Sequence, residues 1–291
     1  MRVIVFTALA YGLAWAWWWG LMAWSDAHAT STIQQALVPI LIALGMFAPT
    51  LAMVLTRVFT RQGWSQLYFL PRPGGWKTWA WLAAWLGTTG MVALGAVLYF
   101  LLVPNSFSLS APLFTGADPV HGSSIWDDSA AVTAGIFAMS IFLAPILNLL
   151  PALGEEWGWR GYLNPQLDQI LPRRAAVLAT GVIWGLWHLP LTLAGHNYGL
   201  ETWGFPYTNV LAMVLFCVTF GVFFSYLAER TGSALAPAIA HATLNGIAGG
   251  GLYFAASPTP FLGPAPTGAV GALPFIAVAA ILLWQLRRTG D

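Results

Sequence analysis

The sequence has little charge. Asp, Glu, Lys and Arg make up 7% of its 291 residues, against roughly 25% in a typical soluble domain. Hydrophobic residues make up 58%, and the mean hydropathy is +0.71. A chain so poor in charge cannot cover itself with a water-facing surface, which excludes an ordinary soluble domain and indicates a membrane protein. The 17 tryptophans agree with that class, because amphipathic rings collect at headgroup depth.

Several other features are missing. The formal net charge of +1 provides no basic field for nucleic acid, so no nucleic-acid partner is expected. A single cysteine, Cys217, excludes an intrachain disulfide, and no surrounding motif marks it as a nucleophile. The helical zinc signature HExxH and the serine-hydrolase signature GxSxG are both absent. The common zinc and serine hydrolase classes are therefore not indicated.

Long apolar runs dominate what is present. Windows of about 20 apolar residues mark membrane-spanning helices. Eight such windows occur, near residues 3–24, 33–56, 78–103, 130–154, 175–194, 208–228, 234–255 and 271–286. We therefore predict an all-α fold, a polytopic membrane helical bundle of about eight transmembrane helices in contact with the lipid bilayer.

The joins between these runs are separated by sign of charge. One set carries the basic residues Arg57, Arg61, Arg72, Lys77, Arg160, Arg173, Arg174, Arg230, Arg287 and Arg288. The opposite set carries Asp26, Asp118, Asp127, Asp128 and Glu201, and no Lys or Arg. Because cytoplasmic joins are enriched in Lys and Arg, this predicts a multi-pass protein of the inner (plasma) membrane with both termini in the cytoplasm.

The first run also has features of a signal peptide, because Arg2 precedes it and small residues follow near Ala27 and Ala29. The run is longer than the roughly 7–15 residues of a signal-peptide core, and it is rich in tryptophan. We therefore expect a retained transmembrane helix.

Two adjacent carboxylates and an arginine interrupt the apolar sequence: Glu155, Glu156 and Arg160. Ionisable groups in hydrocarbon are costly, rare and usually functional. In a helix Glu156 and Arg160 share a face and can pair, while Glu155 is turned about 100° away. We expect Arg160 to neutralise Glu156 and to leave Glu155 free as a proton acceptor. The alternative is a helix end in cytoplasmic water, with both acids solvated.

Two further polar sites lie in later apolar runs. His188 follows Trp184 at helical spacing, and hydrogen-bonded packing would explain such a histidine equally well. His241 and Asn245 are four residues apart, so their side chains project the same way. They could also simply hydrogen-bond across packed membrane helices.

Taken together, the three polar sites favour hydrolysis. Glu155 and His188 could hold and deprotonate a water, while His241 and Asn245 stabilise an oxyanion. Glu155, His188 and His241 could instead ligate a divalent metal such as zinc, with Asn245 orienting His241. The cofactor is therefore left open, and we favour catalysis without a metal.

These residues resemble a known family. The run from Glu155 to Arg160 resembles the EExxxR motif of the CPBP family, the CAAX protease and bacteriocin-processing (Abi) family of intramembrane endopeptidases. Trp184 and His188 are similar to its second motif, an aromatic residue four before a histidine, where Phe is commoner than Trp. His241 and Asn245 are similar to its third motif, HxxxN.

The resemblance implies an eight-helix intramembrane protease whose site opens toward the cytoplasm. It implies water activation by Glu155 and His188, an oxyanion site at His241 and Asn245, and supporting roles for Glu156, Arg160 and Trp184. The expected partner is a peptide or protein substrate, membrane-associated in the CAAX-type case; peptide processing or immunity is the other role. A non-catalytic transporter or a peptide-binding immunity scaffold is the alternative.

The resemblance also divides the chain. Residues 1–129 are expected to form the N-terminal transmembrane helices and an external loop. Residues 130–255 are expected to form the catalytic core, and residues 256–291 a C-terminal loop and the last transmembrane helix.

Overall fold

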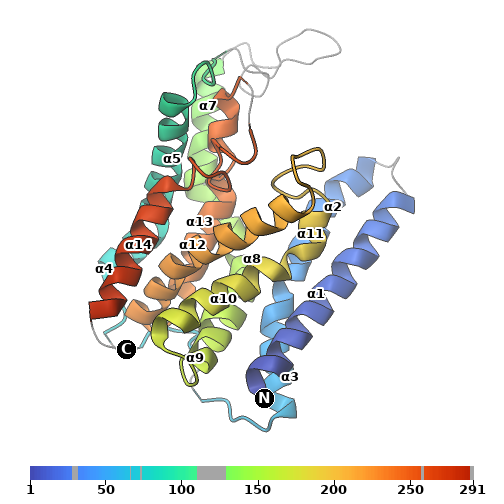
Figure 1. Cartoon of the computed structure of the whole chain (residues 1–291), viewed down its shortest axis with the longest axis vertical. Coiled ribbons are helices and arrows are strands. Elements are labelled where there is room, and N and C mark those ends of the chain that lie inside the picture. The colour runs from blue at the N-terminus through green and yellow to red at the C-terminus, as the bar shows by residue number, and fades with distance from the viewer. Residues whose placement is uncertain (28–31, 66, 73, 110–128, 257–258, 289–291) are drawn as a thin grey trace.

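The chain folds into a bundle of helices (Figure 1). The computed structural model describes all residues except 28–31, 66, 73, 110–128, 257–258 and 289–291, so most of the predicted external loop lies outside the described residues. Within the described part, β-structure is limited to two isolated bridges, Phe107–Ala255 and Thr259–Gly263. The predicted all-α membrane class is confirmed.

The helices follow one another with several short breaks. The first half of the chain contains α1 (Arg2–Ala27), α2 (Thr32–Leu44), η1 (Gly45–Phe47), α3 (Ala48–Phe59), α4 (Thr78–Leu82), η2 (Ala83–Gly87), α5 (Thr88–Leu102), α7 (Ser129–Ala138) and η3 (Met139–Leu143). The second half contains α8 (Ala144–Gly158), η4 (Trp159–Leu163), α9 (Asn164–Leu167), α10 (Arg173–Trp187), α11 (Leu189–Leu193), α12 (Tyr207–Thr231), α13 (Leu235–Ile247), η5 (Gly250–Phe254) and α14 (Leu273–Arg288). The elements η1 and η5 are 3₁₀-helices, and η2, η3 and η4 are π-helices.

The helical stretches differ in their capacity to cross a membrane. Among the described residues, five stretches are long and apolar enough: Arg2–Ser25, Leu37–Phe59, Thr78–Leu102, Ala134–Leu167 and Tyr207–Thr231. The other three predicted spans correspond to α10, α13 and α14, which have 15, 13 and 16 residues. A helix of 13 residues is roughly 20 Å long, shorter than the roughly 30 Å of bilayer hydrocarbon. The helix predicted over 234–255 therefore ends early, and the 3₁₀-helix η5 follows it.

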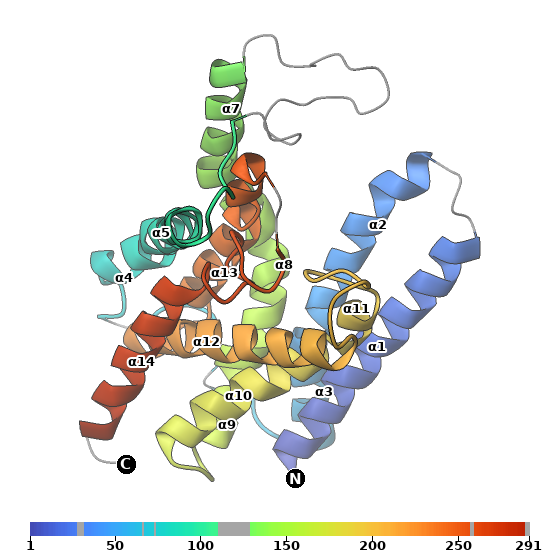
Figure 2. The same cartoon turned by 45° about the horizontal axis from the view of Figure 1, so that its top comes forward.

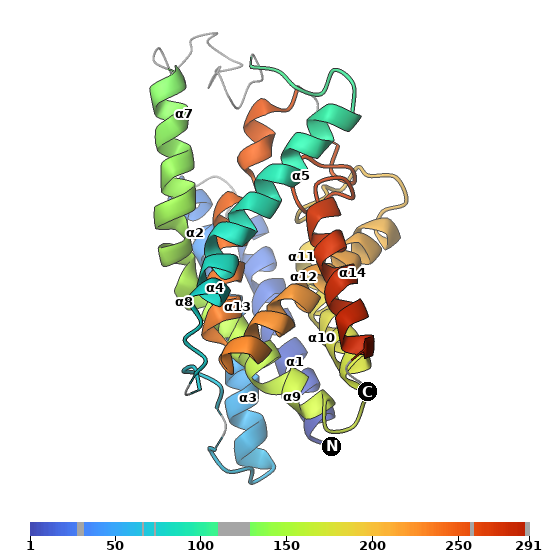
Figure 3. The same ribbon diagram turned by 90° about the vertical axis from the view of Figure 1, so that its left-hand side faces the viewer.

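Both ends of the described chain lie together. Figure 3 shows that α1 begins and α14 ends at the same end of the bundle, close to α9. We refer to this end as the α9 end. The arrangement agrees with an even number of crossings.

Two basic residues that were assigned to joins lie inside helices instead. Arg160 lies in η4 and Arg57 in the last turn of α3, and they are only 2% and 4% exposed. The helix that carries the acidic pair continues past the predicted boundary at 154, through α9. Arg160 can be buried because Glu156 neutralises it. Arg57 donates to the backbone carbonyl of Gly63, and its guanidinium lies 5.3 Å from the centroid of the Tyr162 ring.

Two glycines, which have no side chain, allow α8 to lie close to the start of α3. Gly154 and Gly158 lie four residues apart, and a Cβ on Gly158 would come within 2.4 Å of the Cβ of Pro49. Thr50 then donates a 2.7 Å hydrogen bond to the carbonyl of Gly154. Small residues at this spacing permit close helix approach in membranes. The acidic pair thus lies on a helix segment that is fixed at two points.

A second pair of glycines does the same for α10 and α12, which pack against each other and cross the bundle in Figure 2. A Cβ on Gly181 would lie 2.6 Å from the Cα of Val218, and one on Gly185 would lie 2.6 Å from the Cα of Val214. The close contact fixes the end of α10 that carries Trp184.

Candidate active site

The two acids lie in the last turn of α8, directly before the π-helix η4. Glu155 is 2% exposed and Glu156 is 0% exposed. The alternative of a helix end with both acids solvated is therefore wrong. π-Helical turns are rare and are often found at functional sites. Here the π-helix begins at Trp159, so the helix geometry changes where the polar groups gather.

Glu156 lies at the centre of a buried ionic contact. The Nη1 atom of Arg160 donates to both oxygens of Glu156 at 2.9 and 3.0 Å, which confirms the predicted pair. The Nδ1 atom of His241 lies 2.9 Å from Oε1 of the same carboxylate. That second contact joins residues 85 positions apart in the chain, and no spacing rule predicts it. Glu156 therefore fixes His241 as well as Arg160.

Glu155 does not pair with Arg160, as predicted, but its carboxylate accepts hydrogen bonds from other residues. Its Oε2 atom accepts a 2.7 Å hydrogen bond from the indole nitrogen of Trp184 and a 3.3 Å one from that of Trp159. Glu155 forms no ion pair with a described residue, as predicted, but helix packing brings to it two indole donors that the sequence analysis did not predict. The contact with Trp159 has a sequence signal that was missed, since Trp159 follows Glu155 at helical spacing.

His188 lies at a helix break and not within one continuous span over 175–194. The helix α10 ends at Trp187, and α11 begins with Pro190 in its first turn. The Nδ1 atom of His188 lies 3.0 Å from the carbonyl of Trp184. A carbonyl only accepts, so Nδ1 carries the proton and Nε2 is the remaining acceptor.

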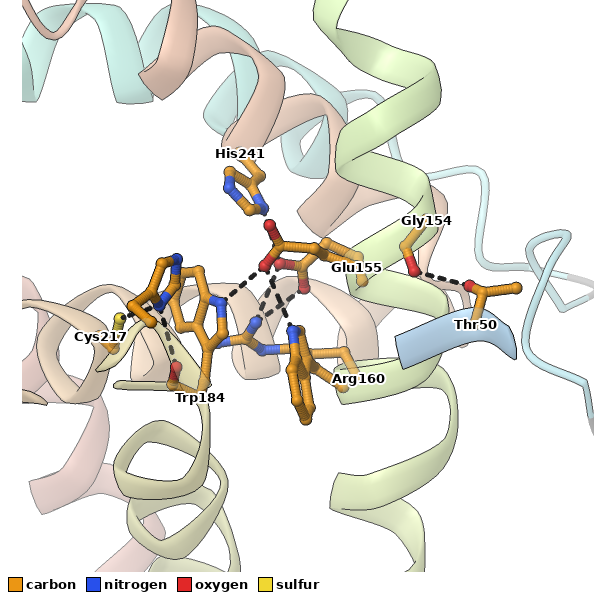
Figure 4. Close-up of polar contacts among 10 residues, drawn as sticks. Thr50, Gly154, Glu155, Arg160, Trp184, Cys217 and His241 are labelled. Carbon is orange, nitrogen blue, oxygen red and sulfur yellow. Dashed lines mark hydrogen bonds and ion pairs between the residues drawn. The ribbon is translucent and has the colours of Figure 1, made fainter. Parts of the chain in front are cut away.

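The indole of Trp184 connects the predicted polar sites (Figure 4). Its ring centroid lies 5.8 Å from that of His188 and 5.4 Å from that of His241. The guanidinium carbon of Arg160 lies 4.4 Å from the same ring, a cation–π contact. Phe224 on α12, which was not predicted, stacks on His241 at 5.6 Å. The three polar sites thus meet around one aromatic ring from α10.

Asn245 lies outside the hydrogen-bonded group of site residues. It lies one turn after His241 on α13 and is exposed, and it forms no hydrogen bond with any described residue. His241 is 5% exposed and faces Glu156. The prediction that both side chains donate to one oxygen therefore stays a prediction.

The single cysteine lies closer to the site than its sequence context indicated. The Sγ atom of Cys217 is buried, 3.8 Å from Nδ1 of His188. That nitrogen donates to the carbonyl of Trp184, so it is not available as a base for the thiol. The arrangement therefore does not form a cysteine–histidine nucleophilic pair.

The three candidate metal ligands do not form a ligand set. In the described part of the chain, no three His, Cys, Asp or Glu side chains lie together closely enough to hold a metal ion. The indole of Trp184 contacts both imidazoles, and the Nδ1 of His241 is engaged by Glu156. As they are arranged, Glu155, His188 and His241 do not fit a resident zinc.

The fold and the site define a class: a polytopic helical bundle with two buried carboxylates, two imidazoles and an arginine in its interior. The family model described as type II CAAX prenyl endopeptidase Rce1-like matches residues 132–247. These residues include every candidate site residue, and they lie inside the segment 130–255. The resemblance to the CPBP family, drawn from the three motifs, is confirmed: the matched region is similar to the CAAX-type intramembrane proteases.

A curated relative gives the same result. The chain is 30% identical over 142 residues to CAAX prenyl protease 2 of Methanococcus maripaludis. The alignment covers 48% of this chain and 50% of the relative, so the chain spans about half the length of that protein.

Proposed function

We propose that this protein is an intramembrane endopeptidase that hydrolyses a peptide bond of a protein or peptide substrate. The observation that carries the proposal is the buried Glu155, hydrogen-bonded by two indoles, of which that of Trp184 also contacts the rings of His188 and His241. A carboxylate held in this way has a fixed orientation within a poorly hydrated interior. The match of residues 132–247 to the Rce1-like family supports the same reaction class.

In the proposed reaction, Glu155 and the Nε2 atom of His188 hold the attacking water. Glu155 accepts a proton from this water as the oxygen attacks the carbonyl carbon of the scissile bond. The C=O π electrons move onto the oxygen, forming a tetrahedral oxyanion. When the C–N bond breaks, the protonated Glu155 returns its proton to the leaving nitrogen, and the carbonyl re-forms as a carboxylic acid.

His241 and Asn245 are proposed to stabilise the oxyanion. Because Nδ1 of His241 contacts Glu156, its Nε2 atom is the one available to substrate, and it must carry a proton in order to donate. The amide of Asn245 would join it when substrate fills the exposed side of α13. Arg160 and Glu156 act by holding His241, and Trp184 acts by holding Glu155.

A peptide-library experiment tests the function. Purified protein in detergent is incubated with a mixed peptide library, including peptides with prenylated CAAX ends, and the products are identified by mass spectrometry. We expect defined cleavage products that disappear in Glu155→Gln. Peptide binding or transport without any cleavage product would instead favour the non-catalytic transporter or scaffold.

The substitution Trp184→Phe is expected to lower kcat by about tenfold or more, because a hydrogen bond to a charged group contributes about 1.5–3 kcal/mol. The Phe ring keeps the packing between the two imidazoles but removes the 2.7 Å donor to Glu155. Steady-state kinetics should show a change in kcat with little change in KM.

Trp187→Phe is the matched control for this substitution. It also removes a buried indole nitrogen, but that nitrogen donates to the carbonyl of Ala10. An equal loss of kcat in both variants would mean that Trp184 acts only through stability.

We also propose that the α9 end faces the cytoplasm of a cell whose plasma membrane holds the protein. Single cysteines introduced in a Cys217→Ala background at the exposed positions Arg72 and Arg230 should react with an impermeant reagent only from the cytoplasmic side. A cysteine at Glu201, exposed near the opposite end, should react only from outside. Labelling of Glu201→Cys from the cytoplasmic side alone would reverse the orientation.

Catalysis is proposed to proceed without a resident metal, since the candidate ligands do not form a ligand set. We expect protein washed with a chelator to keep its activity and to contain far less than stoichiometric zinc by elemental analysis. Stoichiometric zinc that tracks activity, and that is lost in His188→Ala and His241→Ala, would overturn this. The indole of Trp184 would then have to move aside for a Glu155, His188 and His241 ligand set.

A further inference from the structure

The α9 end contains a second polar feature, a cavity that shares Arg160 with the buried acids. A cavity of about 660 Å³ lies between the segment that follows α3, the α9 region, the start of α10 and the end of α12. Its wall includes four arginines and only two carboxylates: Arg57, Arg72, Arg160, Arg173, Asp168 and Glu229. A hollow with this excess of positive charge in a membrane protein is suited to an anion.

Both carboxylates form ion pairs with one arginine, Arg173. Arg173 binds Asp168 and also donates a 2.9 Å hydrogen bond to Glu229. Burial raises the pKa of Asp168 to about 6, although Arg173 opposes the shift. Both carboxylates therefore lie beside Arg173, and Arg57 and Arg72 are further cations of the cavity wall.

Several buried polar atoms of residues in this wall have no hydrogen-bond partner among the described residues. They include Oγ of Ser225 and the Nε and Nη2 atoms of Arg160, in residues that are each 2% exposed. Buried polar groups are normally hydrogen-bonded, and an unsatisfied one costs about 1–3 kcal/mol. Unsatisfied hydrogen-bond donors beside a polar cavity indicate that the cavity binds a ligand with hydrogen-bond acceptors.

The side chain of Arg72 occupies space that the backbone leaves open at Gly232. Gly232 ends α12 in the left-handed conformation, with φ of 67°, and a Cβ there would lie 2.4 Å from Nε of Arg72. The guanidinium of Arg72 also lies 5.4 Å from the centroid of the Tyr68 ring. A residue larger than glycine would displace this side chain from the cavity wall.

Exposed tryptophans at the same end of the bundle indicate that the anion belongs to a lipid headgroup. The segment between α3 and α4 exposes Trp64 and Trp76, and Trp79 is exposed at the start of α4; their exposed fractions are 53%, 65% and 44%. Exposed tryptophans of this kind lie at headgroup depth. Basic pockets at the cytoplasmic end of membrane bundles bind the headgroups of anionic lipids.

From these observations we propose that the cavity at the α9 end binds a phosphate group, with Arg57, Arg72, Arg160 and Ser225 as its donors. The phosphate of an anionic phospholipid and free inorganic phosphate share this chemistry. The exposed tryptophans favour the lipid phosphate over free phosphate, because tryptophans collect at headgroup depth. The proposal does not rest on the peptidase reaction, although Arg160 belongs to both sites through its ion pair with Glu156.

Calorimetric titration in phosphate-free detergent tests the proposal. The probes are inorganic phosphate, dihexanoyl phosphatidylglycerol below its micelle concentration, and dihexanoyl phosphatidylcholine as a zwitterionic control. We expect phosphatidylglycerol to bind more tightly than phosphatidylcholine and phosphate to compete with it. Tighter binding of phosphate than of phosphatidylglycerol would assign the cavity to a soluble anion.

Variants show whether the cavity is responsible. Arg72→Gln should weaken binding by about tenfold or more, because charge-assisted hydrogen bonds are the strong ones. Ser225→Ala should weaken it less, and it serves as the second probe if Arg72→Gln does not fold. Arg230→Gln is the control, an exposed arginine at the same end that does not line this cavity.

Equal affinity of the Arg72→Gln and Ser225→Ala variants and the unchanged protein would overturn the proposal. So would the absence of any binding by phosphate and phosphatidylglycerol. Competition by a peptide with a free carboxyl terminus, but not by phosphate, would assign the cavity to substrate instead.

Discussion

Glu155→Gln is expected to lower peptide hydrolysis by at least the 10²–10⁴-fold that a positioned general base contributes. Glutamine has the same shape and keeps one oxygen to accept from the indoles of Trp159 and Trp184. It cannot take a proton from water. The loss should therefore appear in kcat, measured on a peptide identified in the library experiment, while the melting temperature in detergent stays close to that of the unchanged protein.

The control for this result is Glu201→Gln, which removes an exposed carboxylate in the segment between α11 and α12. It should keep full activity. Full activity in Glu155→Gln would remove Glu155 from the role of base. A variant that is inactive but also melts early would show that Glu155 acts through the fold, and the role of base would then be decided by His188→Ala.

Glu156→Gln is expected to act through stability. It leaves the guanidinium of Arg160 buried without its countercharge, and it weakens the anchor of His241. Removing one partner of a buried ion pair costs about 3–5 kcal/mol. The melting temperature in detergent should fall clearly, and the activity of the protein that remains folded should fall because His241 is less well held.

A double variant separates these effects. Glu156→Gln combined with Arg160→Gln removes both charges, so it should be more stable than Glu156→Gln alone. Activity should stay low in the double variant, because His241 still lacks its carboxylate. If the double variant were no more stable than Glu156→Gln, the ion pair would not be the source of the destabilisation.

The sequence was sufficient for features that depend on nearby residues. Apolar run length gave the membrane class, and the four-residue spacing of Glu156 and Arg160 gave their ion pair, because a helix places such residues on one face. The same rule would have found the contact of Trp159 with Glu155. Three short motifs in the right order gave the family resemblance.

The sequence was less informative about features that depend on burial in the folded protein. Arg57 and Arg160 were counted as cytoplasmic charges, because a charged residue at the end of an apolar run has the same pattern whether it is solvated or paired. The break at His188 was missed because Pro190, two residues later, was read as a kink within one apolar span. Helix length was overestimated at α13 because the apolar run continues past Ile247, where the helix ends.

What the sequence determined by itself is a polytopic α-helical membrane chain with three polar sites in its interior. Only the tertiary structure decided which groups meet: Glu156 with His241, and Glu155 with Trp184, from helices that are far apart in the chain. These contacts depend on how closely helices approach and how they are rotated, which is set by glycines such as Gly158 and Gly185. Local periodicity contains no information on that rotation, so the orientation of each side chain toward its partner appears only when the helices pack.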